Sequence, residues 1–269
     1  MQLAVILAAA GSSQRYAAAQ LATDPSAQPR SKLDEDLGGR PVLQRSVELF
    51  SNIPQVSQII VAGPSDAGAF AAFKERYGDK LGLLGCMIIA GGSEFRYQTV
   101  ALALKCLRPE ITHVAVHDAA RPCCPAILIE KLMEAAAEFG AAIPGIEVTD
   151  SIKRIGAKAA HAKADPLEAI LGSSTRRQYA VVGESVERAG LIAVQTPQIF
   201  SRSLLDAAYA QSDLASTDDA GLVSKLGHEV VVVAGDTRNI KITRPDDVAL
   251  ARAILNVAAA QERPAHLRF

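Results

Sequence analysis

The sequence contains no tryptophan, and aromatic residues make up only 4% of its 269 positions. Proteins that bind single-stranded nucleic acid stack the bases on aromatic side chains, so this scarcity argues against such a surface. Net charge is almost absent as well, because 28 Lys and Arg residues balance 29 Asp and Glu residues. Nucleic-acid binding normally leaves a basic excess. We therefore expect no nucleic-acid partner, whereas a small anion held by a few converging cations is compatible with this balance.

Cysteine is also sparse, and its spacing matches neither a zinc motif nor a disulfide framework. The four cysteines are Cys86, Cys106, Cys123 and Cys124. Such usage is typical of a reducing compartment. The apolar residues 1–11 follow no basic segment and are too few to span a membrane. We expect them to form a buried strand, and we expect a cytoplasmic protein without a membrane partner.

Short apolar runs alternate with helical patterns over the first half of the chain. The predicted strands are residues 3–8, 58–63, 86–90 and 112–118. The predicted helices are residues 42–50 and about 66–77, 94–107 and 125–139. This alternation is typical of parallel βαβ units. It predicts an α/β fold with a Rossmann-like, mostly parallel, doubly wound sheet, whose ligand crevice lies at the carboxyl ends of the strands. The polar stretch before Pro41 is interpreted as a long loop.

The pattern changes after Pro144. Residues 148–155 alternate like a half-exposed strand, and the following stretch to about residue 179 is polar and poorly periodic, which is typical of a projecting arm. Regular patterning then returns, with strands at 191–197 and 229–235 and helices near 201–210, near 217–226 and from Pro245. We expect one domain over residues 1–269, with a protruding β-arm at about 147–190.

Small residues follow the first predicted strand in the segment AAAGSSQR, residues 8–15. Small side chains let a ligand approach the backbone, whose N–H groups can bind phosphate. The segment lacks both the GKS or GKT ending of a P-loop and the GxGxxG pattern, so tight packing explains it equally well. Arg15 and the later Lys32 would supply two cations for phosphoryl-transfer chemistry. A solvated loop charge is the alternative for Lys32.

The segment VHDAARP, residues 116–122, ends the fourth predicted strand, where the crevice is expected. A carboxylate at this place, Asp118, suits a hard cation such as Mg²⁺. An ion pair between Asp118 and Arg121 that fixes a loop is the alternative. His117 is interpreted as a structural hydrogen-bonding residue rather than a base.

Two further segments contribute polar residues to the same predicted rim. Lys241 lies in NIKITRPDD, residues 239–247, after a strand and before a helix that starts with proline. Thr217 lies in STDDA, residues 216–220, where it could be a helix N-cap followed by first-turn acids. Each of these signals is weak alone.

Together the segments resemble the 2-C-methyl-D-erythritol 4-phosphate cytidylyltransferase family from Val5 to about Leu255. Its motifs occur in order as AAAGSSQR, GGSEFRYQTV, VHDAARP, VTDSIKR with VERAGL and QTPQIF, and STDDA with NIKITRPDD. The resemblance implies transfer of CMP from CTP to 2-C-methyl-D-erythritol 4-phosphate, giving 4-diphosphocytidyl-2-C-methyl-D-erythritol and pyrophosphate in the non-mevalonate route to isoprenoids. It also implies Mg²⁺ or another divalent cation. A ribitol 5-phosphate cytidylyltransferase and a non-catalytic nucleotide-binding paralogue are the alternatives.

The resemblance also implies roles for individual residues. The catalytic pair would be Arg15 and Lys32. Nucleotide binding would fall to Ala9, Ala10, Gly11, Gly92, Thr99 and Asp118, with Asp118 as the metal ligand. Substrate binding would fall to Ala119, Ser151, Arg188, Thr217 and Lys241. The arm residues Ser151 and Arg188 match positions that reach into a neighbouring subunit, so the resemblance implies a homodimer.

The sequence departs from the family pattern in three places. Residues 16–31 form an insertion before Lys32, which leaves Arg30 as an alternative phosphate ligand, although long loop insertions cost little free energy. GGSEFRYQTV carries one extra residue, so either Ser93 or Glu94 takes the position beside the ribose. Residues 156–180 lengthen the arm and have no counterpart in the family.

Overall fold

The protein is described by a computed structural model that covers residues 1–258 apart from positions 12, 27, 29 and 162–177. The chain divides into two compact units. The first combines residues 1–146 with the chain from residue 194 onward, and the second is Glu147–Ala193. None of the described helices has the length and apolar character needed to cross a membrane.

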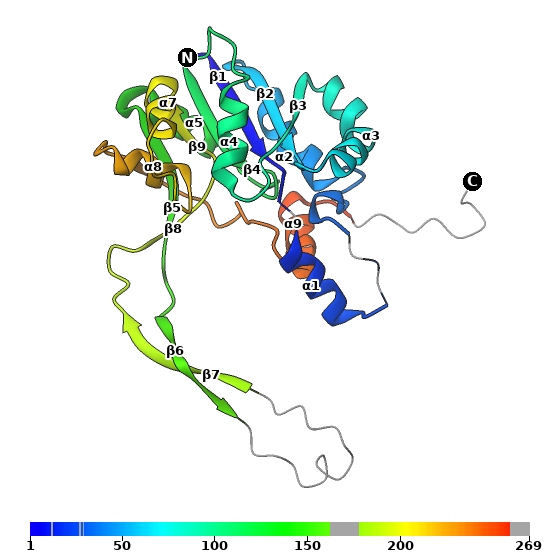
Figure 1. The fold of residues 1–269 in the computed structure, drawn as a ribbon, viewed down its shortest axis with the longest axis vertical. Helices are drawn as coiled ribbons and strands as arrows, with labels where there is room; N and C mark the ends of the chain where they lie inside the picture. The colour runs from blue at the N-terminus through cyan, green and yellow to red at the C-terminus, as the bar shows by residue number, and fades with distance from the viewer. Residues whose placement is uncertain (12, 27, 29, 162–177, 259–269) are drawn as a thin grey trace, which may run out of the picture. The chain divides into compact units, whose positions relative to one another are not determined.

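A mostly parallel sheet forms the centre of the first unit (Figure 1). Its strands are β1 (Leu3–Ala8), β2 (Val56–Gly63), β3 (Cys86–Ala90), β4 (His113–Asp118), β5 (Ala141–Glu147), β9 (Gln198–Ser201) and β10 (Val231–Ala234). Their spatial order is β10-β5-β9-β4-β1-β2-β3. The neighbours β1–β2, β2–β3, β1–β4 and β5–β10 are parallel, whereas β9 runs antiparallel to both β4 and β5. The predicted α/β fold class is confirmed.

Helices pack against both faces of this sheet because its strands are apolar on both sides. They are α1 (Gln14–Thr23), α2 (Val42–Ser51), α3 (Ala67–Leu83), α4 (Arg96–Leu104), α5 (Ala126–Phe139), α7 (Arg202–Tyr209), α8 (Asp219–Lys225) and α9 (Pro245–Leu255), with a 3₁₀ turn, η1 (Lys32–Asp34). On β1, Leu3, Val5 and Leu7 face the core shared with α2, α3, α5 and α9. Ala4 and Ile6 face the opposite core, shared with α4, α7 and α8. This alternation is the period of two of an extended strand.

The prediction of a loop throughout the polar stretch before Pro41 is wrong for residues 14–23, which form α1. Three consecutive alanines, residues 17–19, favour a helix, but the segment shows no amphipathic pattern because Tyr16 is its buried residue. Tertiary packing supplies what the pattern lacks: Tyr16 joins the core, and α1 contacts α9. Elsewhere α3 extends beyond the predicted end at residue 77, and α4 is shorter than predicted at both ends.

The second unit contains a two-stranded antiparallel sheet formed by β6 (Ile152–His161) and β7 (Gln178–Val186), drawn in Figure 1. The short strand β8 (Ile192–Val194) lies where the chain returns to the first unit. Ile155, Tyr179 and Val182 are exposed apolar side chains on this hairpin. Of the expected insertion at 156–180, residues 162–177 lie outside the described part of the chain.

Candidate active site

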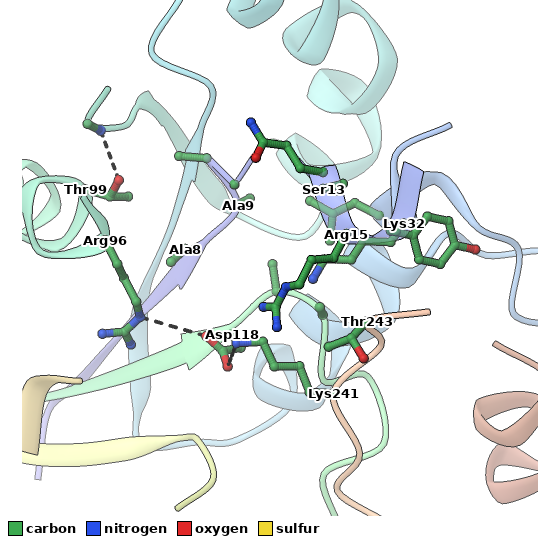
Figure 2. A pocket seen from close by; sticks show the side chains of 18 of the residues that line it. Ala8, Ala9, Ser13, Arg15, Lys32, Arg96, Thr99, Asp118, Lys241 and Thr243 are labelled. Atoms are coloured by element: carbon green, nitrogen blue, oxygen red, sulfur yellow. Dashed lines mark hydrogen bonds and ion pairs between the residues drawn. The ribbon is translucent and has the colours of Figure 1, made fainter. Parts of the chain in front are cut away.

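A cavity of about 440 Å³ lies at the carboxyl ends of β1, β3 and β4 (Figure 2). The carboxyl ends of these mutually parallel strands lie along one edge of the sheet, so residues from three distant segments meet there. The cavity contains ten of the residues predicted for the site: Ala9, Ala10, Gly11, Arg15, Lys32, Gly92, Thr99, Asp118, Ala119 and Lys241. The crevice therefore lies where the strand pattern placed it.

The turn between β1 and α1 forms one side of the cavity. Ala9 continues the ladder of β1, because its N–H donates to the Ala62 carbonyl at 2.8 Å. Ser13 is the N-cap of α1 in the left-handed conformation, with φ 53°, and its buried hydroxyl has no hydrogen-bond partner in the described structure. Arg15 therefore sits in the first turn of a helix, beside free backbone N–H groups. A helix N-terminus with small residues before it is suited to binding an anion.

Lys32, directly after the insertion, lines this cavity, whereas Arg30 does not. Its Nζ donates to the Ile242 carbonyl at 3.0 Å, which anchors the side chain beside the loop that carries Lys241. Burial lowers the pKa of Lys32, and the neighbouring cations Lys241 and Arg15 lower it further. Arg30 lines a different cavity. The concentration of positive charge at Lys32 makes this part of the cavity suitable for a polyanion.

The start of α4 forms the opposite side of the cavity. The Gly92 N–H donates to the Thr99 hydroxyl at 3.0 Å, which ties the glycine loop to the helix. A Cβ on Gly92 would lie 2.4 Å from the Cβ of Gln98, so the loop approaches α4 too closely for any other residue. Ser93 and Glu94 both line the cavity beside it, so both stay candidates for the position beside the ribose.

Asp118 is surrounded by three cations. Its carboxylate lies 2.9 Å from Nζ of Lys241, 3.4 Å from Nε of Arg121 and 3.9 Å from Nε of Arg96. Burial alone would raise the pKa of Asp118, but Lys241 and Arg96 outweigh it and hold that pKa well below its usual range. The Asp118–Arg121 ion pair considered as the structural alternative is present, and Asp118 also lines the cavity. The two interpretations of this residue are compatible.

His117 has the structural role expected of it. It is fully buried, its Nε2 lies 3.0 Å from the Arg121 carbonyl, and its Nδ1 lies 3.2 Å from the Thr196 hydroxyl. Its ring packs edge-on against Phe50. Burial lowers the pKa of His117 to about 4, so the ring is neutral near pH 7.

Three predicted site residues lie elsewhere. Thr217 is exposed and is not among the described residues that line the cavity. It is not the N-cap of α8 either, because Asp218 takes that place and accepts a hydrogen bond from the Gly221 N–H. Ser151 and Arg188 belong to the second unit, where Arg188 donates to the Thr149 carbonyl.

Sequence reasoning assigned no role to Arg96, although its guanidinium lines the cavity and contacts Asp118. The signal was present, because GGSEFRYQTV places this arginine directly after the glycine loop and at the start of α4. It also missed Tyr16 and Thr243, which line the cavity near Lys32 and Lys241. No pattern distinguished these residues from ordinary helix and loop positions.

The residues at the cavity fit a magnesium ion that arrives with phosphate groups. In the described part of the chain, no cluster of three or more His, Cys, Asp or Glu residues could hold a metal by itself. Asp118 and Glu94 are the carboxylates that line the cavity. Magnesium in nucleotide sites is usually held by one or two carboxylates together with substrate phosphates. Asp118 can supply one such ligand.

The family described as "IspD: 2-C-methyl-D-erythritol 4-phosphate cytidylyltransferase" matches residues 3–257. The chain belongs to this family. It is 38% identical over 223 residues to the cytidylyltransferase of that name from Frankia casuarinae, covering 81% of this chain and 72% of the relative. The one from Bacillus licheniformis is 33% identical over 271 residues, covering 99% of this chain and all of the relative.

Solved structures of this cytidylyltransferase family have the same fold. The crystal structure of the Thermus thermophilus family member superimposes with a TM-score of 0.66 at 28% identity. That match covers 96% of this chain and the whole of the other. The family fold therefore spans almost the whole chain, with Asp118 and Arg15 at the strand edge where the cavity lies.

Proposed function

We propose that this cytidylyltransferase transfers the CMP moiety of CTP to 2-C-methyl-D-erythritol 4-phosphate. The products are 4-diphosphocytidyl-2-C-methyl-D-erythritol and pyrophosphate, in the non-mevalonate route to isoprenoid precursors. The observation that carries this proposal beyond family membership is the convergence of Arg15, Lys32 and Lys241 on one cavity of a protein whose net charge is −1. Such a local surplus of cations suits two phosphorylated ligands.

The chemistry requires positioning and charge stabilisation rather than proton transfer. An oxygen of the acceptor phosphate, already anionic, attacks the α-phosphorus of CTP, and the bond to the β-phosphate oxygen breaks to release pyrophosphate. Negative charge builds on the α-phosphoryl oxygens, where Arg15 and Lys32 would stabilise it. His117 is buried away from the cavity and plays no part as a base. Its role is to hold the loop after β4.

The remaining cavity residues would bind the two substrates. Backbone groups of Ala9, Ala10 and Gly11 would receive the phosphates, and Gly92 with Thr99 would contact the cytosine. Asp118 and Ala119 would lie beside the sugar, and Lys241 would hold the acceptor. Backbone and small side chains can read a base edge by hydrogen bonds, which agrees with the low aromatic content. A magnesium ion bound mainly by the substrate phosphates, with Asp118 beside it, would neutralise phosphate oxygens.

The active enzyme in this proposal is a cytoplasmic homodimer. Ser151 and Arg188 would complete the acceptor site of the partner subunit, as the family resemblance implies. Exposed apolar side chains on the hairpin, Ile155 and Val182, give such a partner a surface to cover. The four free cysteines are compatible with a reducing compartment.

Pyrophosphate release tests the proposal directly. Purified protein with CTP and Mg²⁺ is supplied with 2-C-methyl-D-erythritol 4-phosphate, with ribitol 5-phosphate, or with no acceptor. We expect release with the first acceptor alone. Release with ribitol 5-phosphate alone would contradict the proposed acceptor, and CTP binding without any release would indicate a nucleotide-binding protein.

The shared site is tested by mixing two inactive variants. Heterodimers of Arg15→Ala and Arg188→Ala subunits contain one intact site if Arg188 acts in the partner's cavity. We expect the mixture to recover part of the wild-type activity. Failure of a proven heterodimer to recover any activity would refute the proposed sharing.

A further inference from the structure

A buried chain of charged and polar groups lies behind the cavity, outside the roles assigned above. Arg96 donates from Nη1 to Oδ2 of Asp219 at 2.6 Å. The second oxygen of Asp219 accepts a hydrogen bond from the Tyr209 hydroxyl at 2.5 Å. Arg96 begins α4, Tyr209 ends α7 and Asp219 begins α8, so the contacts connect three helices on one face of the sheet.

Asp219 is buried and fully paired. Its side chain is 0% exposed, and both carboxylate oxygens are occupied by the two contacts above. The start of α8 is fixed to the sheet by Gln198 of β9, which accepts a hydrogen bond from the Ala220 N–H and donates one to Asp218. A buried carboxylate is costly unless it is paired, so breaking the Asp219–Arg96 ion pair would be strongly unfavourable.

Arg96 is shared unequally between two carboxylates. Nη1 of Arg96 lies 2.6 Å from Oδ2 of Asp219. Nε of Arg96 lies 3.9 Å from Oδ1 of Asp118, which is too long for a hydrogen bond. Figure 2 shows the Arg96 side chain extending toward Asp118. Burial works against the charge on Arg96, but Asp219 and Asp118 outweigh it and raise its pKa. The guanidinium therefore stays charged. Its contact with Asp219 holds it at a distance from Asp118 at which the two make no hydrogen bond.

This arrangement leaves one oxygen of Asp118 open. Oδ2 lies against Lys241 at 2.9 Å and Arg121 at 3.4 Å. Oδ1, by contrast, accepts no hydrogen bond within the described part of the chain, and its ion-pair contact with Arg96 is long, at 3.9 Å. Asp118 lines the cavity, so Oδ1 is an acceptor available to a ligand.

We propose that Asp219, supported by Tyr209, is a positioning residue that holds Arg96 back from Asp118 and thereby keeps Oδ1 of Asp118 free to accept a hydrogen bond from a sugar hydroxyl. The hydroxyl belongs either to the ribose of CTP or to the polyol acceptor. Without Asp219, the Arg96 guanidinium moves onto Asp118 and occupies that oxygen. This inference rests on the proposed function, because it takes the cavity to bind both substrates.

The Asp219→Asn variant tests the proposal, since the amide keeps the shape of the side chain and loses its charge. The dissociation constant of CTP is measured by calorimetry without acceptor, and KM for the acceptor is measured at saturating CTP. We expect one of the two constants to rise roughly tenfold or more, as the loss of a hydrogen bond to a charged group predicts. The constant that rises identifies which substrate carries the hydroxyl. The matched control is Asp206→Asn, which removes the charge of an exposed acid on α7 that pairs with Arg202; both constants stay at their wild-type values.

A second substitution separates positioning from simple structural support. In the double variant Asp219→Asn with Arg96→Gln, there is no guanidinium to move onto Asp118, so most of the lost affinity returns. A double variant as weak as Asp219→Asn alone would overturn the proposal, as would unchanged constants in Asp219→Asn.

If Asp219→Asn does not fold, Tyr209→Phe removes only the supporting hydroxyl. We then expect a smaller rise, about two- to fivefold, in the same constant. Unchanged constants in a folded Tyr209→Phe protein would in that case overturn the proposal. The proposed function fails separately, if the wild-type protein releases no pyrophosphate with CTP and 2-C-methyl-D-erythritol 4-phosphate.

Discussion

Two sides of the cavity are built in opposite ways. The turn side consists of residues 9–11 and 13–15, which follow one another in the chain and present mostly backbone and small side chains. The ion side consists of Asp118 with Lys241 and Arg96, which come from segments far apart in the sequence, and with Arg121, three residues after Asp118; ion pairs connect these groups. The turn side depends on local conformation, whereas the ion side depends on the packing of the whole unit. Substitutions on the turn side should therefore impair mainly turnover or ligand binding, whereas substitutions on the ion side should impair mainly stability.

The largest expected effect is on the turn side, in the variant Arg15→Ala. Loss of one group that stabilises transition-state charge typically lowers kcat by about 10²- to 10³-fold. Stability should not change, because Arg15 has an exposed side chain at the start of α1. Turnover is measured by pyrophosphate release and stability by thermal unfolding. The control is Arg30→Ala, which removes a cation of the 16–31 insertion that lines a different cavity and should keep wild-type turnover. Normal turnover in Arg15→Ala would remove this residue from the mechanism.

Substitution of Asp118 on the ion side should lower the stability of the folded protein. The variant Asp118→Asn leaves the largely buried Arg121 without its carboxylate partner, and removes one of the two carboxylates beside Arg96. Breaking a buried ion pair from one side is strongly destabilising, so we expect a loss of about 3 kcal/mol in the free energy of unfolding by urea. As a control, Asp213→Asn breaks an exposed ion pair with Lys225 and should leave the free energy of unfolding unchanged. An unchanged midpoint in Asp118→Asn would show that solvent, rather than Asp118, balances these cations.

The pH dependence of stability provides a second test of the ion side. His117 lies behind the ion side, and burial lowers its folded pKa to about 4, below the ordinary value of about 6.5. The unfolded chain therefore binds the proton more readily than the folded protein. The contribution of His117 to stability is complete above pH 6.5 and is lost as the pH falls toward 4. We expect about 2 kcal/mol of this loss between pH 7.5 and pH 5. The variant His117→Gln should lose less over that interval, and an equal loss would assign the effect to other groups.

The smallest expected effect is on the turn side and concerns ligand approach. Among the described residues beyond its two chain neighbours, no atom lies within 4 Å of a Cβ placed on Gly11, so Gly11→Ala should fold with wild-type stability. A methyl group there obstructs phosphates that approach the backbone, so KM for CTP should rise roughly tenfold, the size of a lost contact. In Gly92→Ala the new methyl lies 2.4 Å from Gln98 inside the protein, so that variant should lose stability as well. An unchanged KM in Gly11→Ala would indicate that the ligand does not come close to this turn.

Sequence reasoning predicted the turn side better than the ion side. The strand ending at Ala8, the small residues after it and the cation Arg15 are read directly from adjacent positions. The helix α1 was missed because Ala17, Ala18 and Ala19 give it propensity without an apolar face, and its burial through Tyr16 depends on α9. On the ion side, Asp118 and Lys241 were predicted by motif, but their direct contact was not.

What the sequence determined by itself is the order of strands and helices and the edge of the sheet at which the motifs end. Those features follow from periodicity and from short-range conformational preferences, which a few neighbouring residues specify. Only the tertiary structure decided that Lys32 rather than Arg30 reaches the cavity, that Thr217 does not, and that Asp219 holds Arg96 across 123 positions of the chain. Such pairings are set by packing and by the cost of burying a charge without a partner, and neither is visible in a run of adjacent residues.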